Sequence, residues 1–163
     1  MNARPTAMQV IQQLEAMSPE RFLAIYEALA REGFGPLDDK VAAALKFRPV
    51  AIRRLAMEKR AETARKLLVR GRQADLCYEL FGSYLVTKAK DLVAEFLDGT
   101  GVPHKECMVE DVEAAKPDPA KLAEVLQALD AKYDPADVTL YLALAAQQWP
   151  SVPEVETAWR MRS

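Results

Sequence analysis

The side chains that could do chemistry are concentrated in one segment, residues 101–113. Within ten positions it carries an imidazole, a thiol and four carboxyl groups: His104, Glu106, Cys107, Glu110, Asp111 and Glu113. A thiolate needs a basic or positive neighbour to be populated at neutral pH, and His104 or Lys105 could supply one beside Cys107. One hypothesis is therefore an enzyme with a Cys107 nucleophile, or a metal held by imidazole, thiolate and carboxylate. The interpretation we favour is a solvated loop in which Cys107 and Met108 pack inward.

The rest of the chain lacks the motifs on which common enzyme and metal sites are built. His104 is the single histidine, and Cys77 stands far from Cys107, so there is no two-histidine zinc site and no Cys-x-x-Cys pair. The six glycines form no phosphate-binding loop, no dinucleotide fingerprint and no Gly-x-Ser-x-Gly elbow. We therefore expect no metal, no cofactor and no catalysis.

A second candidate site is basic. Residues 48–72 carry nine Lys or Arg against two Glu, and clustered cations bind phosphates. Three pairs recur every six residues, and six residues turn an α-helix by about 240° net, so successive pairs point in different directions. This spacing favours a helix whose charges pair with acidic elements. The alternative is weak binding of nucleic acid, or of a partner, by the six paired cations: Arg53, Arg54, Lys59, Arg60, Arg65 and Lys66.

The distal part of the chain is acidic in compensation. From residue 91 to 163 there are 14 Asp or Glu against six Lys or Arg, although the whole chain has a formal net charge of −2. Opposite charges in one small molecule should not stay far apart. We therefore expect the basic helix to lie near these acids, within one chain or across a homodimer.

The composition and the residues typical of helix ends predict the elements that position these side chains. The 27 Ala and 19 Leu outnumber the 16 Val and Ile, which favours helix over strand. Prolines follow capping residues in Ser18-Pro19, Asp118-Pro119 and Asp134-Pro135, as is typical of helix starts. Thr6 with Gln9 and Ser151 with Glu154 are typical of capping boxes. Gly33, Gly71 and Gly99 follow periodic segments and are expected to be left-handed caps.

These signals predict an all-α chain of about seven or eight helices without a sheet, folded as a bundle or as stacked helical hairpins. We expect helices near 7–17, 19–32, 38–47, 49–71, 73–98, 118–133, 135–148 and 151 onward, with a kink or break at Gly82-Ser83. The helix at 135–148 is apolar on most sides and should be central. We expect one domain over residues 1–163, with 99–117 as its one plausible internal boundary.

Taken together, the sequence predicts a small soluble helical protein that acts by protein–protein contact, including self-association as a homodimer. Nucleic-acid binding by the segment 48–72 is the first alternative, and an enzyme or metal site at His104 and Cys107 is the second. The longest apolar run is far short of a bilayer span, so we expect no membrane partner. No signal peptide is evident and two cysteines make no disulfide framework, so we expect a cytoplasmic location.

Overall fold

The computed structural model describes residues 9–31 and 56–162 of the chain. These residues are 74% helical, with eight α-helices and no sheet. The one β-type pairing among them is an isolated bridge between Lys105 and Met108. The all-α prediction is therefore confirmed. The expected helix at 38–47, the beginning of the one at 49–71 and the capping residues Thr6 and Gly33 lie outside the described residues.

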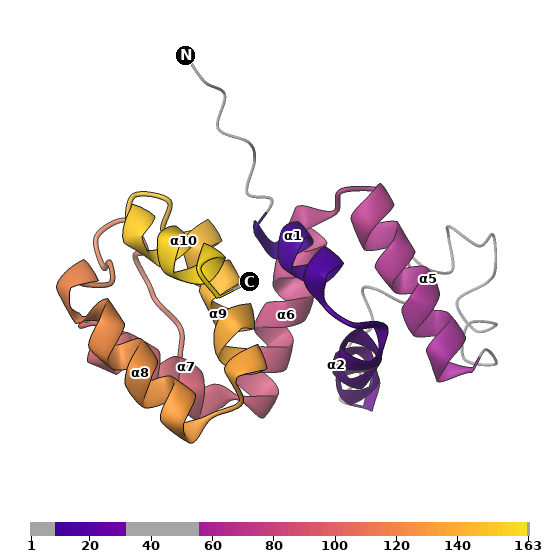
Figure 1. The fold of residues 1–163 in the computed structure, drawn as a ribbon, viewed down its shortest axis with the longest axis horizontal. Helices are drawn as coiled ribbons and strands as arrows, with labels where there is room; N and C mark the ends of the chain where they lie inside the picture. Colours follow the sequence, from indigo (N-terminus) through magenta and orange to yellow (C-terminus); the bar gives the residue numbers. More distant parts are fainter. Residues whose placement is uncertain (1–8, 32–55, 163) are drawn as a thin grey trace, which may run out of the picture. The chain divides into compact units, whose positions relative to one another are not determined.

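The described residues divide into two compact units, one of residues 10–84 and one of Gln9 with residues 85–162. The boundary in the sequence falls within one helix, between Tyr84 and Leu85. Four helices lie wholly or mainly in residues 10–84: α1 (Gln9–Ala16), α2 (Pro19–Arg31), α5 (Met57–Arg70) and α6 (Ala74–Lys88). The second unit holds the end of α6, then α7 (Lys90–Gly99), a 3-10 turn η1 (Pro119–Lys121), α8 (Leu122–Lys132), α9 (Pro135–Gln148) and α10 (Pro153–Arg160) (Figure 1). Folding as one domain, with 99–117 as its possible internal boundary, stays a prediction.

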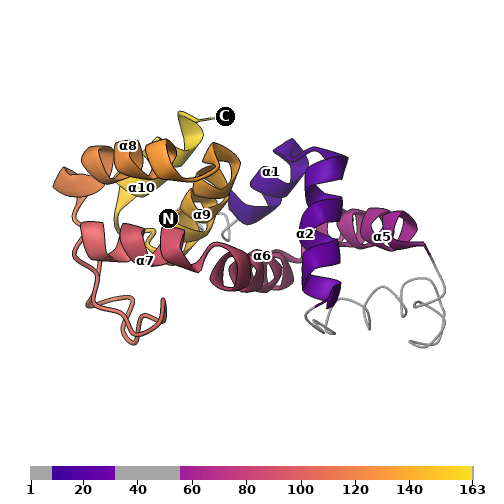
Figure 2. The same cartoon turned by 90° about the horizontal axis from the view of Figure 1, so that it is seen from below.

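The unit of residues 85–163 is built around α9. Eight of its fourteen residues are buried, including the unbroken run from Leu140 to Ala146, so the prediction of a central helix is confirmed. Asp134 caps this helix by accepting from the Ala136 N–H at 2.9 Å, and Pro135 occupies the first helical position. α8 and α10 pack on α9, and α7 packs on α8 (Figure 2).

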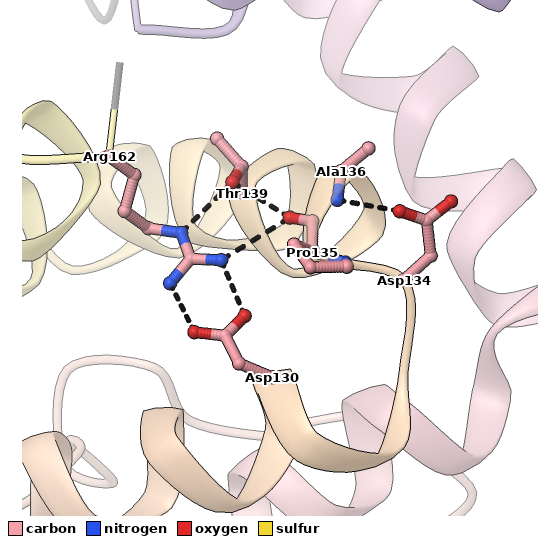
Figure 3. A network of polar contacts seen from close by, with 6 residues as sticks. All are labelled: Asp130, Asp134, Pro135, Ala136, Thr139 and Arg162. Carbon is pink, nitrogen blue, oxygen red and sulfur yellow. Dashed lines mark hydrogen bonds and ion pairs between the residues drawn. The ribbon is translucent and has the colours of Figure 1, made fainter.

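A polar network ties the end of the chain to the corner between α8 and α9 (Figure 3). The Arg162 guanidinium donates to both carboxylate oxygens of Asp130, at 2.7 and 2.6 Å. It also donates to the Thr139 hydroxyl at 2.9 Å and to the Pro135 carbonyl at 3.3 Å. Because such fork-shaped pairing is geometrically specific, it fixes where the residues after α10 lie on this unit.

Three local expectations are wrong. α6 runs through Gly82 and Ser83, and the break comes at Ala89 instead; the flanking side chains of Leu80, Phe81 and Leu85 are buried, and such packing outweighs the low helix propensity of one glycine. The last helix begins at Pro153 without a side-chain cap, because proline at the first helical position makes Val152, not Ser151, the capping residue.

The third concerns the glycines. Gly71 is right-handed, with φ of −81°, and Gly99 is the last residue of α7. Among the glycines that the structure describes, Gly101 is left-handed, with φ of 78°. Gly99 is required for another reason: a Cβ there would lie 2.7 Å from Cγ2 of Val125. A glycine at this position therefore allows α7 to approach α8 closely.

Candidate functional site

In the unit of residues 10–84, α2 packs against α5 and a groove lies between the two helices. On α5, Ala61, Ala64 and Leu68 are buried, and the two alanines let α2 approach closely. The guanidinium of Arg60 lies 5.7 Å from the centre of the Tyr26 ring of α2, and only 8% of Arg60 is exposed. This arrangement buries the arginine stem and directs its charge onto an aromatic face.

Arg65 extends from the same helix to the end of α1. Its guanidinium donates to the main-chain oxygens of Leu14, at 3.1 Å, and Met17, and lies 3.5 Å from the oxygen of Glu15. The last carbonyls of a helix have no partner within the helix and carry its partial negative charge. Arg65 therefore acts as the C-terminal cap of α1 and fixes α1 on α5.

Beside these contacts lies a groove with a volume of about 830 Å³, lined by the start of α2, one face of α5 and Glu15 of α1. Its apolar lining comes from Pro19, Phe22, Leu23, Ala61 and Val69, and its charged lining from Glu15, Glu20, Glu58, Glu62, Arg65, Lys66 and Arg70. An apolar depression with charges around it is typical of surfaces that bind an amphipathic helix.

Four exposed charges form a stripe along the groove face of α5: Glu58, Glu62, Lys66 and Arg70, which we call the α5 charge stripe. Residues four apart lie on one face of a helix, so the stripe is acidic in its first half and basic in its second. The Lys66 ammonium lies 2.9 Å from the Glu62 carboxylate. This hydrogen bond, the charge of Lys66 and then that of Lys59 lower the pKa of Glu62 below its ordinary value.

The basic residues that the sequence singled out are not brought together on one open face. Arg53 and Arg54 lie outside the described residues, Arg60 packs on Tyr26, and Arg65 caps α1. Lys66 belongs to the α5 charge stripe, and Lys59 is exposed but does not line the groove. Contact between this helix and the distal acids would join the two units and stays a prediction.

The segment around His104 and Cys107 forms a tight turn. Lys105 and Met108 exchange two main-chain hydrogen bonds of 2.9 Å, with Glu106 and Cys107 at φ of 50° and 70° between them. The His104 Nδ1 accepts the Cys107 main-chain N–H at 3.1 Å, so the ring proton is on Nε2, which donates to the Asp98 carboxylate at 2.8 Å. Both ring nitrogens are therefore occupied in holding the turn to the end of α7.

The hydrogen bond of the Cys107 thiol is made to the main chain of α7 and not to His104. Its Sγ donates to the Lys90 carbonyl at 3.4 Å, and burial raises its pKa above the ordinary value. A raised pKa disfavours the thiolate that a nucleophile or a metal ligand requires. Within residues 9–31 and 56–162, no three histidine, cysteine or acidic side chains are placed to share a metal ion. The turn thus has the contacts of a structural element, with Met108 exposed rather than packed inward as expected.

Sequence reasoning missed the groove because two helices far apart in the sequence form it. Leu23 was a usable signal, since it lies off the buried face of α2 that Phe22, Ile25, Tyr26 and Leu29 define. The regular spacing of four in the α5 charge stripe was another. Other cations obscure this spacing, because Lys59, Arg60 and Arg65 lie between the members of the stripe in the sequence.

Comparisons with protein-family models, curated proteins and solved structures find no match to this chain. In the part of the chain that the structure describes, no helix combines the length and the apolar character needed to cross a bilayer.

Proposed function

We propose that this protein is a non-catalytic protein-interaction module whose binding surface is the groove between α2 and α5. The observation that supports this proposal is the groove itself: apolar side chains of both helices line it together with charges of both signs. Binding surfaces for protein helices combine such an apolar centre with a polar rim. A reducing, cytoplasmic compartment fits the two free cysteines.

The charges of the groove favour protein over nucleic acid as the ligand. Glu15, Glu20, Glu58 and Glu62 all line it, and a phosphate backbone would be repelled by these carboxylates. Two of the described cations of the basic segment, Arg60 and Arg65, are engaged in packing and capping contacts. An enzymatic function has no comparable support, since both nitrogens of His104 are already hydrogen-bonded.

Site-specific photo-crosslinking tests the proposal. A photoreactive amino acid replaces Leu23, which lines the groove, and in a control chain it replaces Gln127, which is exposed on α8. We expect discrete protein adducts from position 23 that disappear when Val69→Arg is added, and none from position 127. Binding is then reconstituted with the purified, identified protein. Absence of adducts from position 23, or the same adducts from both positions, would reject the groove as a binding surface.

A further inference from the structure

The α5 charge stripe has a symmetry that identifies one ligand for the groove. Read along the helix, its charges are negative, negative, positive and positive, at Glu58, Glu62, Lys66 and Arg70. Turned end to end, the same stripe reads positive, positive, negative and negative. A two-fold axis near the middle of α5 would therefore place Glu58 of one copy opposite Arg70 of the other, and Glu62 opposite Lys66.

We infer that a second copy of this chain occupies the groove, with the α5 helices of the two copies antiparallel. This inference rests on the proposed function, because it assigns a ligand to the same groove. A two-fold interface must be complementary to itself, and the stripe meets that condition in the antiparallel arrangement alone; parallel helices would set like charges against each other. An unrelated partner would need to carry the same pattern by coincidence.

The surroundings of the stripe fit this arrangement. Val69 lies beside it on α5, and Pro19 and Leu23 line the groove from α2, so a docked helix would cover apolar surface as well as pair charges. Within the described residues, Glu58 and Arg70 form no ion pair that would compete with one across the interface. The contact is short, since fourteen residues of α5 span about 21 Å.

Interactions within a single helix also favour part of this charge order, and they predict a monomer instead of a dimer. Acids near the start and bases near the end of a helix interact favourably with its dipole, and Glu62 with Lys66 is a favourable pair within one helix. These effects stabilise α5 in a single chain and would leave the protein monomeric. The oligomeric state of the full chain therefore separates the two explanations.

The test is sedimentation equilibrium of the full chain from about 10 μM to about 1 mM, at 0.1 M and 1 M salt. We expect a dimer at 0.1 M salt whose dissociation constant rises by about tenfold or more at 1 M salt, because the exposed pairs are screened. A chain that stays monomeric at all concentrations overturns the inference. Adducts between position 23 and a different protein would then leave the proposed function standing, whereas absence of any adduct removes both.

Charge reversal supplies the specific evidence. Glu58→Lys with Glu62→Lys makes the stripe wholly basic, and Lys66→Glu with Arg70→Glu makes it wholly acidic. Each variant should be monomeric alone, and mixing the two should restore a dimer. Lys59→Glu, on the same helix but outside the groove lining, is the matched control and should dimerise like the original chain.

A helix-content measurement and one further double variant keep the result interpretable if a reversal unfolds the chain. Circular dichroism first verifies the helix content of each variant. Glu58→Gln with Arg70→Gln removes the outer pair without placing like charges together, and it should weaken the dimer at 0.1 M salt but much less at 1 M salt. A dimer that persists unchanged in all three double variants overturns the inference, because its contact would lie on another face.

Discussion

The guanidinium of Arg65 donates to the main-chain oxygen of Leu14 at 3.1 Å, across 51 positions of sequence. The charge pattern predicts acidic partners for the basic segment as a whole, and contact with the distal acids stays a prediction. Arg65 donates to carbonyl groups at the end of α1, which carry no titratable charge but concentrate the negative end of the helix dipole. One member of the basic segment therefore stabilises the unit of residues 10–84 from within.

Removing this guanidinium should destabilise the protein with little dependence on salt. We expect Arg65→Met to lower the free energy of unfolding by about 1–3 kcal/mol, because several carbonyl oxygens lose a charged donor. Partly buried contacts are screened weakly by salt, so denaturant unfolding at 0.1 M and 1 M salt should show similar losses. Arg31→Met, which removes an exposed pair with Glu27 within α2, is the control and should change stability far less. A loss that vanishes at 1 M salt would instead support acidic partners for Arg65.

A second prediction concerns the close approach of α7 and α8. Gly99→Ala should lower the free energy of unfolding by about 1–3 kcal/mol, because its Cβ would be forced against the Val125 side chain. In a Val125→Ala background the same substitution should cost much less, since the clashing methyl is gone. Denaturant unfolding of the four proteins gives the coupling energy.

The control for this cycle is Gly101→Ala. No atom lies within 4 Å of a Cβ at this position, but φ is 78°, so the substitution should cost about 1–2 kcal/mol through backbone strain alone. That cost should be the same with valine or alanine at position 125. If Gly99→Ala costs the same free energy of unfolding in both backgrounds, a clash with Val125 is not the source of the loss.

The sequence was sufficient for the fold where local signals and packing agree. Asp134-Pro135 before a long apolar run predicts both the start and the central position of α9, and the structure has both. It was insufficient where packing overrides propensity, as at Gly82, which stays helical between buried neighbours. A single helix pattern does not show which distant element will cover it.

The site was less predictable than the fold for the same reason. The sequence shows which reactive side chains the turn at His104 contains. It does not show their roles, because these depend on the hydrogen bond between His104 and Asp98 of α7. The roles of Arg60 and Arg65 depend on Tyr26 and on the end of α1. Charge counts along the chain cannot distinguish a cation that faces solvent from one that caps another helix.

The ion pair between Arg162 and Asp130 should make the free energy of unfolding depend on pH. The hydrogen bonds from Arg162 hold the pKa of Asp130 below its ordinary value. Burial opposes this lowering, and the charge of Arg162 adds to it. A carboxyl with a lowered folded-state pKa stabilises the protein above its ordinary pKa, and this contribution is lost as the pH falls through the lowered value. Asp130→Asn should therefore lower the free energy of unfolding at pH 7 by about 1 kcal/mol, a value reduced for solvent screening.

Thermal or denaturant unfolding from pH 7 to about pH 2 measures this contribution. The original chain and Asp130→Asn should converge in stability at the acidic end, where both side chains are neutral. Glu27→Gln, which removes an exposed pair with Arg31 within α2, is the control and should lose only a few tenths of a kcal/mol. A difference for Asp130→Asn that is independent of pH would show that the pair is not the source of the effect.

The two cysteines should differ in reactivity, and the difference tests the enzymatic alternative. Burial raises the pKa of the Cys77 thiol to about 12, and that side chain is inaccessible. Cys107 is partly accessible, with a less perturbed thiol. A disulfide reagent at pH 8 should therefore modify one thiol in the folded protein and two after denaturation, and Cys107→Ser should abolish the reaction of the folded protein. His104 accepts the main-chain N–H of Cys107 rather than its thiol proton, so His104→Ala should not slow this reaction. In a catalytic pair, by contrast, Cys107 would react near pH 6, and removing the imidazole would abolish that reactivity.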